Sequence, residues 1–366
     1  MFVKPQAHMV GSVPAAFADY SRAAIDGVAK RLEPYLVART GGEEGRSETW
    51  ILGIMDATAK RLGVQSDNTQ IKDYSELKPA EGGWAALTLD ESLLPFEAEA
   101  DRVFEATRAL QVSPRSHLRR LLPVQVGVTH WVDQLAFTLG DDALDDSDIR
   151  VAFKQLHASV IRTIHAKYGD RVIFQIESPY SLRQVANAAP EDQGRVAKRM
   201  AEYIHDIVEL APQGAKFVVH LCRGDLKHES WPTEDDSLRP VVALANAVVD
   251  GWPAGRELAF VHLPLRKAQD LPSLDRRFYR PLAHLSSHGR FAAGIISERV
   301  GFDHNIEALT IAAEVYHGDA PPEERIFEAA GGPCGGGRMS FREYVDWLEQ
   351  YRLVMEALQE ALRAQS

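Results

Sequence analysis

The sequence predicts an α/β fold, a (β/α)8 TIM barrel formed by one domain with an insertion after its first strand. Short runs rich in β-branched residues alternate with longer amphipathic stretches along the chain. This alternation occurs about eight times, in a chain longer than the roughly 250 residues that are typical of such barrels. Polar and metal-binding residue types also follow several predicted strands, where a barrel of this class places its active site.

Each expected element is a run with the period of a strand or of a helix. The expected strands are Ala7–Val10, Trp84–Leu89, Pro123–Val128, Arg171–Ile176, Phe217–Leu221, Leu258–Leu263, Phe291–Ile296 and Arg325–Glu328. The expected helices are Ala16–Leu36, Thr49–Leu62, Glu97–Leu110, Asp148–Lys167, Glu191–Leu210, Leu238–Val249, Asn305–Tyr316 and Ser340–Arg363. In the last helix, Ser340 followed three residues later by Glu343 predicts a capping box.

The chain 1–366 is expected to be a single domain, because it shows no repeat, low-complexity tract or evident linker. Residues 36–83 carry one helix and much polar sequence, which indicates the insertion. The helix 340–363 is expected to cover the barrel through an apolar stripe. A doubly wound open sheet is the alternative, although the Gly-x-Gly-x-x-Gly fingerprint it would often carry after the first strand is absent.

Composition excludes several functional classes. No run of about twenty apolar residues occurs, which argues against a transmembrane helix. The first residues lack the apolar stretch of a signal peptide, and two cysteines cannot build a disulfide framework, so we expect a cytoplasmic protein. The net charge is -11 and the basic residues are scattered, which argues against a nucleic-acid groove.

The most informative residues are His220, Cys222 and Cys334. His220 and Cys222 end a predicted strand two positions apart, so both side chains can face one point. Cys334 lies in a glycine-rich loop after the last predicted strand. Imidazole and thiolate are ligands that zinc favours, and three of them would leave one coordination position for chemistry. His262, at the end of the next strand, is a candidate for a fourth ligand.

A cysteine taken alone is more often a small buried apolar residue than a metal ligand. Here the His-x-Cys spacing, and the position of both cysteines after predicted strands, favour a zinc site. An open zinc that activates water, as in a hydrolase, is a further possibility, but thiol-rich ligand sets favour it less than histidine-rich ones.

At these residues the chain resembles the superfamily of cobalamin-independent methionine synthase and uroporphyrinogen decarboxylase, and more closely the catalytic barrel of the methionine synthase branch. The matching motifs are Gly11-Ser12-Val13-Pro14, Gln175-Ile176-Glu177-Ser178-Pro179, His220-Leu221-Cys222 and Cys334-Gly335. The resemblance implies that the histidine and both cysteines bind Zn2+, that the zinc binds a substrate thiol, and that Ser12 and Glu177 contact substrate.

The chain departs from that pattern around the metal. His262 stands where methionine synthases have a zinc-ligating glutamate, and Ser297-Glu298-Arg299 stands where they have an Asp-x-His proton donor. Glu177-Ser178 replaces Asp-Glu, which removes a carboxylate that would hold the ammonium of homocysteine. The resemblance therefore implies a zinc-dependent methyl- or alkyltransferase that forms a thioether on a different thiol, with a different alkyl donor, or both.

Several roles and partners follow from this interpretation. Glu298, Arg299 and Asp225 are candidates for assisting the leaving atom, and Arg223 is a candidate for binding an oxyanion group of the substrate. The expected partners are a small-molecule thiol and an alkyl donor, with a folate or a corrinoid protein as a source of methyl groups. One alternative is the epoxyalkane:coenzyme M transferase branch, which opens an epoxide. Others are a metal-free lyase resembling uroporphyrinogen decarboxylase and a barrel without catalytic activity.

Overall fold

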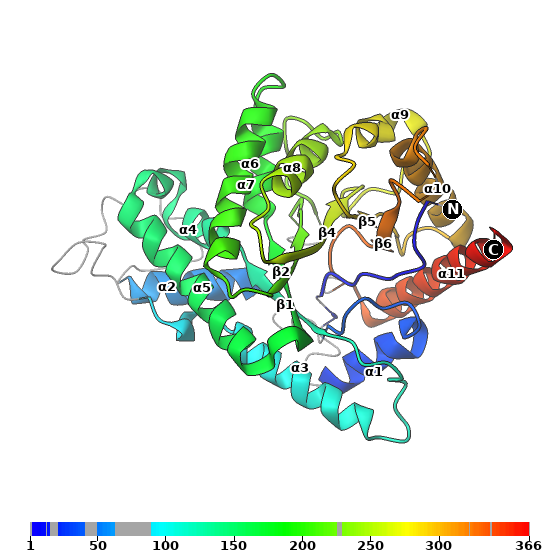
Figure 1. Cartoon of the computed structure of the whole chain (residues 1–366), viewed down its shortest axis with the longest axis horizontal. Coiled ribbons are helices and arrows are strands. Elements are labelled where there is room, and N and C mark those ends of the chain that lie inside the picture. Colours follow the sequence, from blue (N-terminus) through cyan, green and yellow to red (C-terminus); the bar gives the residue numbers. More distant parts are fainter. Residues whose placement is uncertain are drawn as a thin grey trace.

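Figure 1 shows the computed structural model of the chain, in which a central group of strands is surrounded by helices. The structure describes residues 2–11, 13–14, 21–40, 50–62, 89–224, 229–321, 323–336 and 339–365. Within these residues the fold is mixed α/β, with a parallel sheet whose six strands pair in chain order. The predicted α/β class is therefore confirmed for this part of the chain.

The six strands are short and mostly buried on both faces, which is typical of parallel sheets with continuous apolar runs. They are β1 (Val124–Thr129), β2 (Val172–Glu177), β3 (Lys216–His220), β4 (Glu257–Pro264), β5 (Phe291–Gly294) and β6 (Phe327–Gly331). Their register aligns the carboxyl ends: Thr129 pairs with Glu177, Glu177 with His220, and His220 with His262. Four polar residues thus form one row across β1 to β4.

Helices follow most strands and lie around the sheet (Figure 1). They are α1 (Ser21–Leu32), α2 (Trp50–Arg61), α3 (Phe96–Gln111), α4 (Trp131–Leu139), α5 (Ser147–Tyr168), α6 (Pro179–Asn187), α7 (Gln193–Leu210), α8 (Arg239–Asp250), α9 (Arg276–Tyr279), α10 (Phe302–His317) and α11 (Phe341–Gln365). Among the residues described, no helix combines the length and the apolar character that a membrane crossing requires.

The two edges of the sheet, β1 and β6, are linked through two extended segments rather than by regular strands. In the first segment, Val3 and Ala7 form parallel bridges to Phe327 and Ala330 of β6. The second segment bridges this one at Leu36, and its residue Arg39 forms a parallel bridge to β1. In the part of the chain that the structure describes, six regular strands and these isolated bridges are present, and the sheet is not closed into a barrel of eight regular strands.

The sheet separates two apolar clusters. The larger one lies between the strands and the helices and includes most of the apolar core. The smaller one consists of six buried residues, Ala38, Ile173, Val218, Phe260, Ala292 and Ala329, which come from the second bridging segment and from β2 to β6. Because side chains alternate along a strand, this second cluster is the opposite face of the sheet, so both faces are covered.

Some sequence-based expectations differ from the structure. The helices α4 and α6 were not expected, and Leu36 and Arg39, assigned to the insertion, bridge towards the sheet. Of the expected strand Trp84–Leu89, all but Leu89 lies outside the described residues, and Leu89 is not in a strand. The capping box is confirmed, because the Ser340 N–H donates to Glu343 (2.7 Å) and the Glu343 N–H donates to the Ser340 hydroxyl (3.3 Å).

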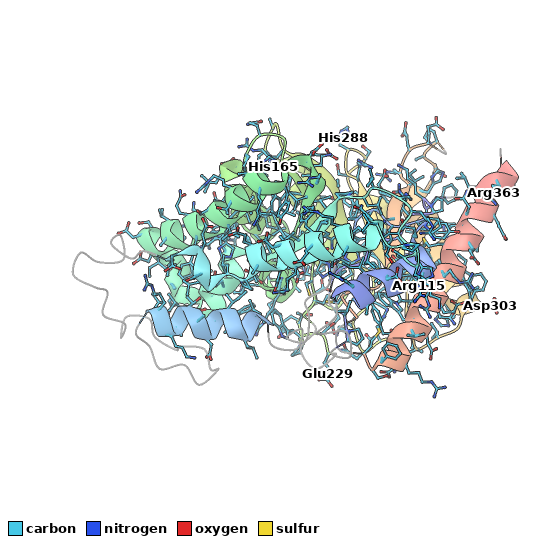
Figure 2. The ribbon with its side chains drawn as sticks, turned by 90° about the horizontal axis from the view of Figure 1, so that it is seen from below. Arg115, His165, Glu229, His288, Asp303 and Arg363 are labelled. Atoms are coloured by element: carbon cyan, nitrogen blue, oxygen red, sulfur yellow. The ribbon has the colours of Figure 1, made fainter. Side chains whose placement is uncertain are left out.

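Many charged side chains lie at the periphery of the molecule. Figure 2 shows His288, Asp303 and Arg363 towards the outline of the molecule, and all three are exposed. By contrast, His8, His220 and His262 are fully buried. These three buried histidines lie together, because the His262 ring contacts the rings of both His8 and His220.

Candidate metal centre

The candidate site begins with a layer of polar side chains on the face of the sheet that carries the smaller apolar cluster. His8 Nε2–H donates to Gln175 Oε1 (3.0 Å), and Gln125 Nε2 donates to the same oxygen (3.1 Å). Gln175 Nε2 in turn donates to Glu177 Oε1 (3.1 Å). These hydrogen bonds join β1 and β2 to the extended segment that contains His8. They lie below the row of polar residues that crosses the carboxyl ends of β1 to β4.

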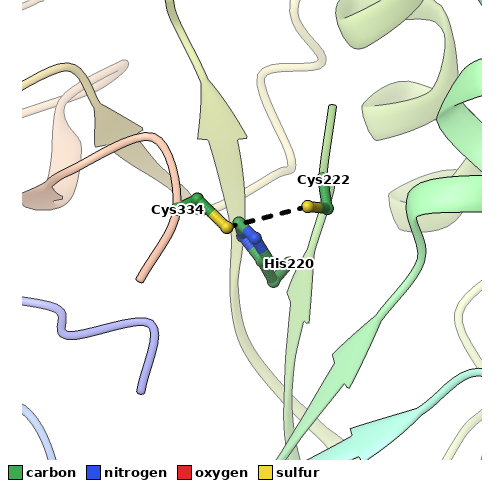
Figure 3. Close-up of side chains that lie close together, drawn as sticks. All are labelled: His220, Cys222 and Cys334. Atoms are coloured by element: carbon green, nitrogen blue, oxygen red, sulfur yellow. Dashed lines mark hydrogen bonds between the residues drawn. The ribbon is translucent and has the colours of Figure 1, made fainter. Parts of the chain in front are cut away.

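His220, Cys222 and Cys334 meet at this end of the sheet. One ligand atom from each of the three lies within 4.8 Å of the others. Figure 3 shows the His220 imidazole and the Cys222 thiol coming from β3 and its continuation, and the Cys334 thiol coming from the loop after β6. No other group of histidine, cysteine and carboxylate side chains in the described part of the chain gathers in this way.

The spacing of these atoms suits zinc. Two thiolates at ~2.3 Å from one tetrahedral zinc ion lie ~3.8 Å apart, and the Cys222 and Cys334 sulfurs are 3.8 Å apart. That separation also excludes a disulfide, whose sulfurs lie at about 2.05 Å. The ligand atom of His220 lies within 4.8 Å of both sulfurs.

The state of His220 also fits a metal ligand. Its ring is fully buried, and Nε2 has no hydrogen-bond partner. Burial, with a smaller contribution from His8, lowers the pKa of His220 to about 3. The ring is therefore neutral near pH 7 and keeps a lone pair for coordination, which is the form that binds metals.

His262 lies against His220 rather than in the group of three. The two Nδ1 atoms are 2.7 Å apart, so one ring donates its N–H to the other. Burial, together with His220 and His8, lowers the pKa of His262 well below its usual value. In many metal sites the second ring nitrogen of a ligating histidine is oriented by such a hydrogen bond. The geometry thus gives His262 the position of a support for His220.

The loop that carries Cys334 is fixed by close contacts with α11. A Cβ at Gly336 would lie 2.4 Å from the Tyr344 ring, and one at Gly332 would lie 2.8 Å from the Trp347 ring. Glycine is therefore required for the loop to approach these aromatic residues. The Trp347 indole N–H also points to Ile296 O, at 3.4 Å, after β5.

The predicted substrate and catalytic residues occupy different surroundings. Glu177 is half-buried at the end of β2 and accepts from Gln175. Glu298 forms a buried ion pair with Arg266, with 3.5 Å between Nη2 and Oε2. Arg299 is exposed and donates to Gln269 O. Ser12 and Asp225 lie outside the described residues.

Arg223 donates to two backbone carbonyl oxygens, Pro264 O (3.4 Å) and Ser237 O (2.9 Å). Sequence reasoning did not single out His8 or Arg266, although both are buried and both contact the site. Neither carries a signal for this position, because His8 pairs with Gln175, 167 positions away, and Arg266 pairs with the carboxylate of Glu298, 32 positions away.

Comparisons with known proteins give distant structural likeness only. No protein-family model matches the chain, and no curated protein sequence matches it. A Listeria monocytogenes protein assigned as a vitamin B12-independent methionine synthase has a TM-score of 0.49 at 15% identity, covering 99% of both chains. A B12-independent methionine synthase from Shewanella, solved with selenomethionine, has a TM-score of 0.47 at 13% identity, covering 74% of this chain and 68% of the other.

A methyltransferase from Methanosarcina mazei has a TM-score of 0.44 at 10% identity and covers 98% of this chain and 94% of the other. These likenesses are too distant to assign an activity. The functional proposal therefore rests on the geometry of the site.

Proposed function

We propose that this protein is a zinc-dependent transferase that moves a methyl or larger alkyl group onto a substrate thiol. The observation that carries the proposal is the group formed by His220, Cys222 and Cys334, whose two sulfurs already have the separation of ligands on one zinc ion. These three residues leave one of four coordination positions for the substrate. We further propose that the six strands and the two bridging segments represent a (β/α)8 barrel with two irregular strands.

The reaction requires a thiol to become a nucleophile. A bound zinc ion would lower the pKa of the substrate thiol and hold the thiolate, which is the reactive form. The S–H bond breaks and an S–C bond forms, while the bond from that carbon to the leaving atom of the donor breaks. The leaving atom takes up a proton in place of the one that the thiol has lost, so protons balance.

The protein groups would bind and orient the reactants. Glu177, at the end of β2, lies in the row that includes His220 and is proposed to contact the thiol substrate. Glu298 is held after β5 by Arg266 and is proposed, with Arg299 and Asp225, to act on the leaving atom. Ser12 is proposed as a second contact of the thiol substrate.

Metal analysis of the purified protein, followed by X-ray absorption at the zinc edge, tests the proposal. About one zinc ion per chain is expected, with two sulfur ligands before any thiol is added. The correct thiol should add one sulfur ligand, and other thiols should not. A protein that binds no zinc, and whose activity is unaffected by Cys222→Ser, would instead favour the metal-free lyase.

A further inference from the structure

Beside the metal centre lies a second space, a cavity of about 390 Å³ between the loop after β3 and the loop after β4. Its lining includes three cations, Arg223, Arg266 and Lys267, and two carboxylates, Asp236 and Asp270. Leu271 and Phe278 supply an apolar wall. The volume lies in the range of pockets that hold small molecules.

The three cations are not equally neutralised. Lys267 forms an ion pair with Asp236, and Arg266 forms one with Glu298. Within the described part of the chain, the Arg223 guanidinium donates to the neutral carbonyl oxygens of Pro264 and Ser237 and to no carboxylate. These bonds use Nε and Nη2. The remaining nitrogen of the guanidinium, Nη1, is left for a ligand in the cavity.

Arg223 is also held in an unfavourable surrounding. Its side chain is half-buried in the wall of the cavity, with only part of its surface open to water. Removing part of a cation from water without a direct counter-ion costs free energy, and a bound anion would offset that cost. The planar fork matches the two oxygens of a carboxylate, sulfonate or phosphate.

The cavity is connected to the metal centre through the residues that line it. Arg223 directly follows Cys222, and its Nε donates to the last residue of β4, the strand that carries His262. Arg266 lines both this cavity and a small void of about 10 Å³ beside Cys334. The cavity therefore adjoins the metal centre, with Arg266 between its interior and the void beside Cys334.

We propose that this cavity binds an anionic group of the substrate at Arg223, so that the enzyme acts on a molecule with a carboxylate, sulfonate or phosphate remote from its reacting atom. The inference rests on the proposed function, because it takes the occupant of the cavity to be a reactant. Under this proposal, Arg223 is the residue that makes the enzyme prefer negatively charged substrates over neutral ones.

Thiol binding to protein substituted with Co2+ tests this proposal, because a new sulfur ligand changes the absorption of the metal. The probes are ω-mercaptoalkanoates of increasing chain length and neutral ω-mercaptoalkanols of matched length. At the best length, wild type should bind the acid at least about tenfold more tightly than the alcohol, as expected for a charge-assisted bidentate contact. Arg223→Gln should abolish this preference without weakening binding of the alcohol.

Arg195→Gln is the matched control, since Arg195 is an exposed residue of α7 paired with Asp192. It should retain the preference for the acid. Arg223→Gln removes the charge and shortens the side chain that donates to Pro264 O and Ser237 O, so its thermal midpoint without ligand is measured to check that the variant folds. Equal binding of acids and alcohols at every length, or a preference that survives in Arg223→Gln, would overturn the proposal and leave the thiol chemistry standing.

Simple alkanoates without a thiol test the anion site at Arg223 separately from the proposed thiol chemistry. If no thiol alters the cobalt spectrum, the proposed function fails. Calorimetry with the alkanoates then tests whether the cavity binds anions. Binding to wild type that Arg223→Gln removes supports the anion site, and no binding to wild type overturns it.

Discussion

The three candidate ligands reach the metal centre by two different routes. His220 and Cys222 belong to β3 and its continuation, where alternation along the backbone points both side chains to one side. Cys334 instead lies in a glycine-rich loop that is shaped by contacts with Tyr344 and Trp347 of α11. We call the first the strand-held half of the site and the second the loop-held half.

The two halves of the site are therefore held in position by different parts of the fold. The strand-held half depends on the sheet and on two buried neighbours, His8 and His262. The loop-held half depends on a helix that follows Cys334 in the sequence, so a change at the surface of that helix can reach the metal. The predictions below test whether the two halves respond separately.

The largest expected effect is the loss of either sulfur ligand. Cys222→Ser and Cys334→Ser should each weaken zinc binding by more than about 100-fold, because even residues that only support metal ligands contribute roughly 10- to 100-fold. Competition with a chromophoric chelator measures the affinity. Retention of wild-type affinity in Cys334→Ser would remove the loop-held half from the site.

Acid should destabilise the strand-held half. Burial lowers the pKa of His8 from 6.5 to about 4. Between these values the unfolded chain binds a proton that the folded chain does not, so the free energy of unfolding falls as the pH falls and is unaffected above 6.5. His8→Gln should remove about 1.4 kcal/mol per pH unit from this slope. Urea unfolding of the metal-free protein from pH 7.5 to 4.5 measures it, and an unchanged slope contradicts the assignment.

Gly336→Ala should perturb the loop-held half alone. The added Cβ would lie 2.4 Å from the Tyr344 ring, and relieving that overlap should cost about 1–3 kcal/mol of stability and displace Cys334. Gly194→Ala in α7 is the control, since its Cβ would meet nothing within 4 Å. The first variant should lose zinc affinity while the control keeps it. Equal affinity in both would show that the loop position does not govern the metal.

His262 tests the support of the strand-held half. His262→Phe should weaken zinc binding by about 10- to 100-fold, and His262→Asn, which can still hydrogen-bond to His220, should restore part of the loss. X-ray absorption should find one imidazole ligand in wild type. Two imidazole ligands would show instead that His262 coordinates the metal.

The smallest effect is expected at the start of α11. Ser340→Ala removes one of the two bonds of the capping box and should lower the free energy of unfolding by about 1 kcal/mol. The zinc affinity of this variant should fall slightly, whereas His220 and Cys222, the strand-held half, should coordinate the metal as in the wild-type protein. A chelator titration that shows no change at all would mean that fraying of the helix end does not reach Cys334.

The sequence was sufficient for the elements with strong periodicity. The runs that became β1 to β5 were located within a few residues, since apolar β-branched stretches are typical of strands buried on both faces. The helix α4 gave no amphipathic signal because all of its residues are buried. The bridges at Leu36 and Arg39 involve single residues and leave no periodic pattern to detect.

The candidate site was predictable where spacing alone carries the chemistry. Cys222 follows His220, the last residue of β3, by two positions, and this spacing already indicates a shared direction. The support from His262, by contrast, depends on the register of β3 against β4. The ion pair of Glu298 with Arg266 joins two loops, and only the folded chain brings these residues together.

The Tyr351 hydroxyl joins distant parts of the chain, because it accepts from the His8 N–H, 343 positions away, and its single hydrogen is shared between the carbonyl oxygens of His8 and Ala330. The two sulfurs are likewise 112 positions apart. Such non-local contacts slow folding, since a long loop must close before the contacts form. During translation, neither the link between His8 and α11 nor the pair of sulfurs can form until the last third of the chain has left the ribosome. The metal centre can consequently be completed only after the six strands β1 to β6 have been synthesised, because they all precede Cys334 in the chain.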